Sequence, residues 1–309
     1  MALMRSILLW GSKNEALRTT LPHFGFIQKA VSRFMPGEDI VDALNAAQVL
    51  QSRGITTVVT HLGENLSDEN EANTVADHYL DVLKRIHERK LDCHVSLKLT
   101  QLGLDFNEEL CYRLLSRIIN QANTMRNFVW IDMESSQYVD VTLRLYKRAR
   151  SEYSNVGVCL QSYLYRSSDD LDSLLALLPS IRLVKGAYAE PKDVAYQKKK
   201  DVDANFLMLA KRLSNLGKKG GVQIGIGTHD DTLLQQIYAA AGQEGIAKDS
   251  YEIQMLYGIQ TEQQLRLVKN GFRVRVLISY GTFWFPWYMR RLAERPANVW
   301  FVVKSIFRR

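Results

Sequence analysis

The chain has 309 residues, of which 46% are hydrophobic and 24% are charged. That balance is typical of a folded globular protein and excludes a disordered chain, a collagen and a disulfide-stapled miniprotein. Forty basic residues against 33 acidic residues give a net charge of +7. A scattered excess of this size suits an anionic membrane surface or a negatively charged cofactor, and it is too small for a nucleic-acid-binding surface.

The cysteine pattern and the absence of long apolar runs bear on the compartment. Cys93, Cys111 and Cys159 are widely spaced and form no Cys-x-x-Cys pair, as expected of thiols in a reducing compartment. No apolar run reaches the roughly 18 residues that a membrane-spanning helix needs, and no small-residue cleavage site follows the apolar residues 1–10. We therefore expect a cytoplasmic protein, with peripheral binding to the inner face of the membrane left open.

Eight short runs rich in Val, Ile and Leu alternate with longer stretches of helical period. Because these runs are apolar along nearly their whole length, they predict strands buried on both faces of a parallel sheet. Residues 38–53 illustrate the stretches between them, with apolar side chains at helical spacing and Gly54 as the residue that ends the helix. The predicted strands are 56–61, 93–99, 128–133, 156–161, 181–185, 222–228, 251–256 and 274–279.

Eight strands and about eight helices in one chain predict a single (β/α)8 barrel of the TIM type, in the α/β class. The competing fold, a doubly wound sheet, normally carries a Gly-x-Gly-x-x-Gly turn after its first strand. Here the first strand leads into His61 and Gly63 without such a turn. With no Pro- or Ser-rich linker, we expect one domain over residues 1–309, in which residues 1–35 form N-terminal helices and residues 54–309 form the barrel.

Polar residues gather at the carboxyl ends of the predicted strands, which is where barrel enzymes place their chemistry. A charged side chain in an apolar strand is costly to bury unless it is paired. One such residue alone is an ordinary ion pair, but six or more converging on one rim predict a site. They are Glu64, Lys98, Asp132, Glu134, Gln161, Tyr163, Arg182, Lys185, Thr228, His229, Asp230, Gln254 and Tyr280.

Several chemistries are compatible with this rim. A metallohydrolase barrel needs a His-x-His pair on its first strand, and His61 has no such partner. A Schiff-base lyase would use a desolvated lysine at a strand end, for which Lys98 and Lys185 both qualify by position. The adjacent Arg290 and Arg291, with the other cations of the rim, favour a carboxylate or phosphate ligand, because guanidinium groups bind both in bidentate geometry.

Four motifs together resemble the proline dehydrogenase family, both its single-function bacterial enzymes and the proline-oxidising domain of bifunctional proline-utilisation proteins. The resemblance runs in order from about Gly54 to Glu294. It implies a distorted barrel that binds FAD at the strand ends, with the last helix covering them. The motifs are RLVKGAY (182–188), GTHD (227–230), YEIQML (251–256) and YMRRLAE (288–294).

The resemblance also implies roles for individual residues. Asp132 and Arg182 are then the catalytic pair, with Arg182 at the N5 edge of the flavin and Asp132 as a polar partner in the pocket. Glu64 is implied as a gate that pairs with Arg290 over the substrate, and Glu294 as the anchor of the covering helix. Together with Arg182, the implied cofactor contacts are Met133, Gln161, Lys185, Gly186, Ala187, Thr228 and His229. The implied substrate contacts are Lys98, Arg290 and Arg291 for the carboxylate, and Leu183, Tyr188 and Leu277 for the ring.

One departure from the family pattern bears on the substrate. The family usually has a tyrosine two residues before the Pro-x-Gly that ends the eighth strand, whereas this chain has Leu277 and Ser279 in RVLISYG (275–281). That tyrosine helps to exclude a hydroxyl group on the ring. The leading expectation is therefore FAD-dependent oxidation of L-proline to Δ1-pyrroline-5-carboxylate, with hydroxyproline as the alternative substrate.

The electron acceptor that the resemblance implies is a membrane quinone. The C-terminal sequence VWFVVKSIFRR (299–309) combines apolar and aromatic residues with terminal arginines, a pattern that suits an interfacial helix as well as a helix packed on the barrel. A non-catalytic module that binds an imino acid is a further alternative, because it would keep Arg290 and Arg291 but bind no flavin. No metal is expected.

Overall fold

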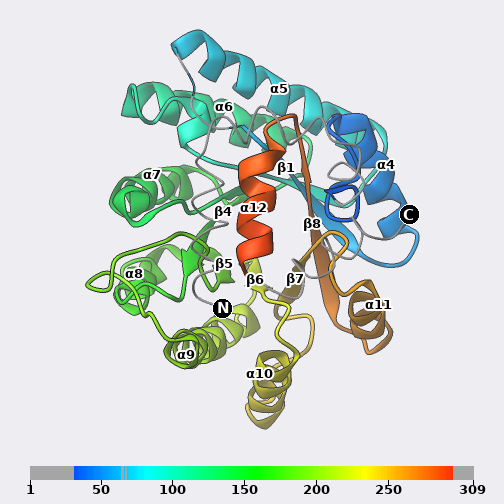
Figure 1. Cartoon of the computed structure of the whole chain (residues 1–309), viewed down its shortest axis with the longest axis vertical. Coiled ribbons are helices and arrows are strands. Elements are labelled where there is room, and N and C mark those ends of the chain that lie inside the picture. The colour runs from blue at the N-terminus through cyan, green and yellow to red at the C-terminus, as the bar shows by residue number, and fades with distance from the viewer. Residues whose placement is uncertain (1–30, 64–65, 67, 295–309) are drawn as a thin grey trace, which may run out of the picture.

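The computed structural model describes residues 31–63, 66 and 68–294, and its strands form a closed parallel barrel (Figure 1). Each strand pairs in parallel with the next, and the eighth pairs with the first, where Thr57 aligns with Val276. The predicted barrel is therefore confirmed. Its strands are β1 (Thr56–His61), β2 (Cys93–Leu97), β3 (Val129–Ile131), β4 (Val156–Gln161), β5 (Ser180–Val184), β6 (Ile224–Gly227), β7 (Glu252–Leu256) and β8 (Arg273–Tyr280).

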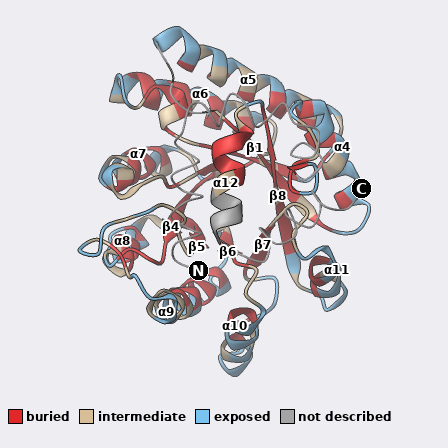
Figure 2. Cartoon of the chain, in the orientation of Figure 1, coloured by how far each residue is buried: buried red, intermediate tan, exposed pale blue. Residues whose placement is uncertain are grey.

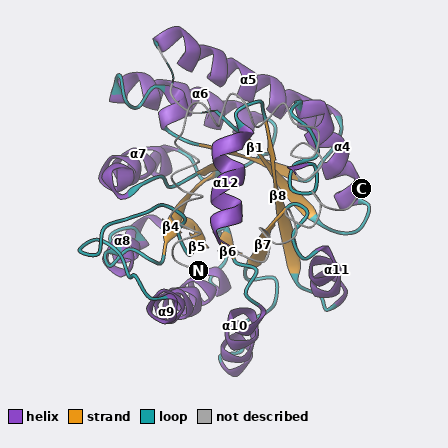
Figure 3. Cartoon of the chain, viewed as in Figure 1, coloured by secondary structure: helices purple, strands orange, loops and turns teal. Residues whose placement is uncertain are grey.

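The helices surround the strands (Figure 3), and several begin at a side chain that caps them. Asp39, Asp68, Asn107 and Asp230 each accept a hydrogen bond from a backbone N–H in the first turn of the helix that follows. The α-helices of the described residues are α4 (Ile40–Gln51), α5 (Glu69–Glu88), α6 (Glu108–Thr124), α7 (Val139–Glu152), α8 (Ser167–Asp172), α9 (Lys199–Lys218), α10 (Asp231–Gln243), α11 (Thr261–Lys269) and α12 (Trp284–Glu294).

The predicted strand bounds differ from the observed ones by at most two residues at either end, and those of β1 and β4 agree. The helix predicted over 38–53 is observed as α4 (Ile40–Gln51), which is two residues shorter at each end. Gly54 follows the predicted helix and has a φ of +74°, the left-handed conformation expected of the residue that ends a helix. The N-terminal helices predicted for residues 1–35 lie almost entirely outside the described residues. No helix among residues 31–63 and 68–294 is both long and apolar enough to cross a membrane.

Two layers of apolar side chains hold the barrel together. The larger layer fills the space between strands and helices, and Figure 2 shows it as the buried inner faces of the helices around buried strands. A smaller cluster of Val58, Phe128 and Trp130, with Leu277 packed against it, joins β1, β3 and β8. Gly157 provides the space for Trp130, because a Cβ at that position would lie 2.5 Å from Cζ3 of the indole.

The last described helix, α12, lies at the carboxyl end of the barrel and crosses in front of it in Figure 1. Its first turns pack Trp284 and Phe285 against Leu62, the residue that follows β1. The indole N–H of Trp284 also donates a hydrogen bond to Glu38 Oε1 (2.7 Å). These contacts place α12 over the strand ends, where the predicted site residues lie.

Candidate active site

Arg182 and Asp132 meet at the carboxyl end of the barrel, as the strand-end pattern predicted. Arg182 projects from β5 and its side chain is only 3% exposed, while Asp132 directly follows β3. The guanidinium Nη1 donates to Asp132 Oδ1 at 2.9 Å. Because an unpaired buried arginine is strongly unfavourable, this contact compensates the charge of Arg182.

Three neutral side chains complete the surroundings of this pair, and sequence reasoning missed all three. The Ser96 hydroxyl donates to Asp132 Oδ1 (2.8 Å) and accepts from Arg182 Nη1 (3.0 Å). The guanidinium carbon of Arg182 lies 4.7 Å from the centre of the Trp130 ring, a cation–π contact. The Cys159 thiol lies 3.7 Å from Asp132 Oδ1, and burial raises its pKa to about 12, so it is a neutral thiol.

Buried polar atoms near Arg182 provide a test of whether the site fits a flavin. Nε and Nη2 of Arg182 are buried and have no hydrogen-bond partner in the described part of the chain. Gln161 at the end of β4 donates to the carbonyls of Met133 and Glu134, both at 3.2 Å, but its Oε1 is likewise buried without a partner there. Donors and an acceptor left unsatisfied in this way fit a polar heterocycle, which presents both kinds of group.

Lys185, which follows β5, is held in a network of charges with two helices. Its Nζ lies 2.7 Å from Asp203 Oδ1 on α9 and 3.0 Å from Asp230 Oδ2, at the start of α10, and Lys199 contacts the same two carboxylates. Although burial raises the pKa of Asp230, hydrogen bonds from Lys199 and Lys185 lower it to about 2. Because its Nζ is already engaged by two carboxylates, Lys185 is poorly placed to attack a carbonyl as a Schiff-base lysine.

The loop after β5 turns sharply at Gly186. Its φ is +106°, and a Cβ there would lie 2.2 Å from Cδ1 of Tyr163, so only glycine fits. The family resemblance implies that Gly186 contacts the cofactor; its neighbour in the structure is the Tyr163 ring. Tyr163 donates to Glu190 Oε1 (3.4 Å), and the Ser136 backbone N–H donates to the same oxygen at 2.7 Å. Glu190 thus ties the loop after β5 to the loop after β3.

The remaining predicted residues take different positions. Leu183 is fully buried in the layer between strands and helices, because successive strand residues face opposite sides and Arg182 faces inward. Its predicted role as a wall of the ring pocket does not fit this position. Leu277 instead packs against the Trp130 cluster. Thr228 Oγ1 accepts from the Asp230 backbone N–H (3.1 Å), and His229 Nε2 accepts from Leu256 N–H (2.9 Å).

Other predicted site residues are half-buried or lie outside the description. Lys98, Ala187 and Tyr188 are half-buried at the ends of β2 and β5, and Met133 is buried after β3. Arg290, Arg291 and Glu294 belong to α12, but their side chains are outside the described part of the structure, as is the whole of Glu64.

A histidine pair lies beside the site, behind the end of β1. His78 Nε2 lies 2.8 Å from the hydroxyl of Tyr280, and the His61 and His78 rings are 4.8 Å apart. Burial, and to a lesser extent the charge of His78, lowers the pKa of His61 to about 4; burial also lowers the pKa of His78. Both groups therefore oppose folding in acid.

We expect His61→Gln to flatten the dependence of stability on pH between about 6.5 and 4. In that interval the unfolded chain protonates His61 and the folded chain does not, so the free energy of unfolding of the wild type falls as the pH falls. Urea unfolding at several pH values measures this. The exposed His87 on the same helix as His78 provides the control, and a His61→Gln variant with the pH profile of His87→Gln would contradict the assignment.

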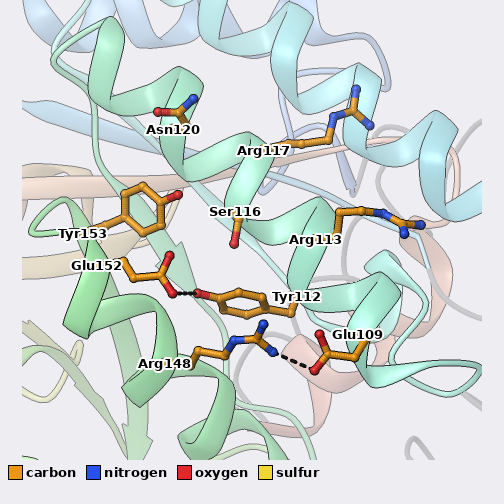
Figure 4. Close-up of a pocket in the computed structure, with 9 residues that line it drawn as sticks. All are labelled: Glu109, Tyr112, Arg113, Ser116, Arg117, Asn120, Arg148, Glu152 and Tyr153. Atoms are coloured by element: carbon orange, nitrogen blue, oxygen red, sulfur yellow. Dashed lines mark hydrogen bonds and ion pairs between the residues drawn. The ribbon is translucent and has the colours of Figure 1, made fainter.

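A groove of about 430 Å³ lies elsewhere, on the outer surface between α6 and α7 (Figure 4). Several of its polar groups already pair: Arg148 contacts Glu109 at 2.7 Å, and the Tyr112 hydroxyl donates to Glu152 at 2.7 Å. Since it lies on the helices and away from the strand ends, it does not compete with the Arg182 site for the catalytic role. Its lining residues are Glu109, Tyr112, Arg113, Ser116, Arg117, Asn120, Arg148, Glu152 and Tyr153.

Comparison with known proteins assigns the chain to a family. The sequence model described as proline dehydrogenase matches residues 43–304. Proline dehydrogenase 1 of Bacillus subtilis subsp. natto is 37% identical over 99% of this chain and 100% of its own, and proline dehydrogenase of Deinococcus radiodurans is 38% identical over 89% of each chain. Proline utilization A from Bdellovibrio bacteriovorus has the same fold, with a TM-score of 0.80 at 23% identity, over 93% of this chain and 38% of that one.

The closed barrel, with a buried arginine–carboxylate pair at its carboxyl end, defines a TIM-type barrel enzyme. With the full-length similarity to curated enzymes, the chain belongs to the proline dehydrogenase family. It is accordingly an oxidoreductase that acts in proline catabolism, and the resemblance inferred from its four motifs is confirmed.

Proposed function

We propose that the chain binds FAD at the carboxyl end of the barrel and oxidises L-proline to Δ1-pyrroline-5-carboxylate by hydride transfer to the flavin N5. The observation that supports this most directly is the buried Arg182, whose Nε and Nη2 have no partner in the described residues. When bound there, FAD supplies the hydride acceptor. Gln161, Met133, Thr228 and His229 would hold it, together with Arg182.

Within this proposal, the protein contributes binding, orientation and charge. Arg182 would hold a fixed positive charge next to a bound flavin, where it would stabilise negative charge on the cofactor. Ser96 and Asp132 fix the direction of its guanidinium through contacts of 3.0 and 2.9 Å. Lys98 and the two arginines of α12 would bind the substrate carboxylate and so orient the ring toward the bound cofactor.

The electron acceptor that we propose is a membrane quinone. The net charge of +7 supports attraction to an anionic leaflet, and the enzyme would then act from the cytoplasmic face of the membrane. The C-terminal residues 299–309, predicted above to suit an interface, lie outside the described residues.

Hydroxyproline is the second candidate substrate, and the observation that supports it is the position of Leu277. Leu277 packs against the cluster that contains Trp130, whose ring lies 4.7 Å from the guanidinium carbon of Arg182. An aliphatic side chain at this position offers no phenol to exclude a ring hydroxyl.

We expect the purified protein to show the visible absorption of a flavin and to bleach anaerobically on addition of L-proline. Parallel addition of trans-4-hydroxy-L-proline measures the preference between the two substrates, and faster bleaching with hydroxyproline would assign that preference to this chain. A colourless protein that cannot be reconstituted with FAD would contradict the proposed function.

A further inference from the structure

A cavity of about 290 Å³ opens at the opposite, N-terminal mouth of the barrel. Its lining residues precede or begin strands: Asp92 comes before β2, Arg126 before β3, and Arg273 is the first residue of β8. The Asp92 and Arg273 side chains are each about half exposed, so the cavity is open to solvent. The cavity therefore lies at the end of the barrel remote from Arg182.

Three arginines line this cavity, and each is held differently. Arg275 is 2% exposed and donates from Nε to Glu252 Oε1 (2.9 Å) and from Nη1 to the Thr57 carbonyl (2.7 Å). Arg273 donates from Nη1 to the Asp249 carbonyl (3.2 Å), and its Nη2 lies 3.6 Å from Glu252 Oε2.

Arg126 differs from the other two arginines, because its side chain forms no ion pair or hydrogen bond with any residue that the structure describes. The carboxylates close to the three arginines are Glu252 and Asp92, and Asp92 lies 3.2 Å from Arg275 Nη1. Three cations therefore face two anions, and the local excess of charge is positive.

His94 lines the same cavity and lies within the field of these charges. Burial lowers its pKa well below the usual value, and the charges of Arg275, Arg182 and Arg273 lower it further. The neutral ring accepts at Nδ1 from the indole N–H of Trp130, at 3.2 Å. Because Trp130 also lies against Arg182, it is the side chain that links the cavity to the catalytic end, across the apolar cluster of Val58 and Phe128.

We propose that the cavity at the N-terminal mouth binds a phosphate-class oxyanion between Arg126 and Arg273, above the buried Arg275. Guanidinium groups are planar and always charged, and they donate in pairs to phosphate oxygens. The guanidinium group of Arg126 has no partner among the described residues. The cavity is large enough for a free phosphate or for the phosphoryl group of a larger molecule. The assignment is independent of the substrate and cofactor proposed above.

Calorimetric titration of the flavin-loaded protein with inorganic phosphate, in a low-salt buffer free of phosphate, tests this site. We expect saturable binding that weakens at least about tenfold in Arg126→Ala and further in the variant that also carries Arg273→Ala. Arg113→Ala, which removes an exposed arginine from the groove between α6 and α7, is the matched control and is expected to bind as the wild type does.

A parallel titration with methyl phosphate distinguishes two sources of the anion. Tighter binding of inorganic phosphate identifies a free ion, and tighter binding of methyl phosphate identifies the phosphoryl group of a larger molecule. The absence of saturable binding by both would overturn the proposal. So would affinity that is unchanged when both arginines are replaced, because the anion would then bind elsewhere.

Discussion

Replacing Arg182 with methionine is expected to lower the rate of proline oxidation by at least about a hundredfold, the scale of loss seen when one preorganised charged donor is removed from an active site. The guanidinium is buried, contacts Asp132 at 2.9 Å, and keeps two nitrogen atoms without a partner in the described residues. Methionine keeps much of the length of the side chain but removes both the charge and the donors. Steady-state turnover of L-proline with an artificial acceptor, normalised to bound flavin, measures the loss.

Two further variants separate a catalytic effect from a structural one. Arg182→Lys keeps the charge but loses the planar fork and the stacking on Trp130, so we expect activity between that of the wild type and that of Arg182→Met. Ser96→Ala removes one hydroxyl that contacts both Arg182 and Asp132, and a smaller loss is expected. Wild-type turnover in a folded, flavin-loaded Arg182→Met protein would refute the proposed role.

The barrel could be predicted because apolar runs and helix periods report burial directly. Two of the three largest errors in the bounds fall where a predicted strand runs into polar residues at its end. Residues 128–133 were predicted as one strand, but β3 is Val129–Ile131, and Asp132 beyond it still donates its backbone N–H to the Leu97 carbonyl (2.8 Å). A strand-like pattern therefore continues into the loop that carries the chemistry.

The candidate site was predicted only in part, because strand ends show which charged residues converge but not which neutral residues lie beneath them. Ser96, Trp130 and Cys159 each stand two residues before a predicted strand-end residue, and that spacing places them on the same inward face. In the structure Leu183 lies on the outward face of β5. The period of two therefore identifies the three partners, but for β5 it leaves the face open, because Leu183 stands beside the predicted Arg182 and two residues before the predicted Lys185.

Other contacts had no local signal. Of the two carboxylates that hold Lys185, Asp230 was among the predicted strand-end residues, but Asp203 lies on α9 and meets Lys185 only when that helix packs beside β5. The pair of Arg275 and Glu252 likewise joins β8 to β7 inside the barrel. Such pairs depend on strand register, which a single sequence does not specify.

Replacing Arg275 with methionine is expected to lower the free energy of unfolding by about 3–5 kcal/mol, the usual cost of removing one partner from a buried ion pair. Arg275 and Glu252 are both only 2% exposed and lie 2.9 Å apart, so the substitution leaves a carboxylate with no cation at that distance in the barrel interior. Arg273 is a poor substitute, because its Nη2 is 3.6 Å from Glu252 and its side chain is about half exposed. Urea unfolding followed by circular dichroism measures the change.

The double variant Arg275→Met with Glu252→Leu identifies the cause of the loss. With both charges removed, the unpaired carboxylate is gone and much of the stability is expected to return. Recovery is incomplete, since Gln254 loses the carboxylate that it contacts at 2.6 Å and the Thr57 carbonyl loses its donor at 2.7 Å. A double variant no more stable than Arg275→Met alone would show that packing and the Thr57 bond, and not the buried charge, account for the effect of Arg275.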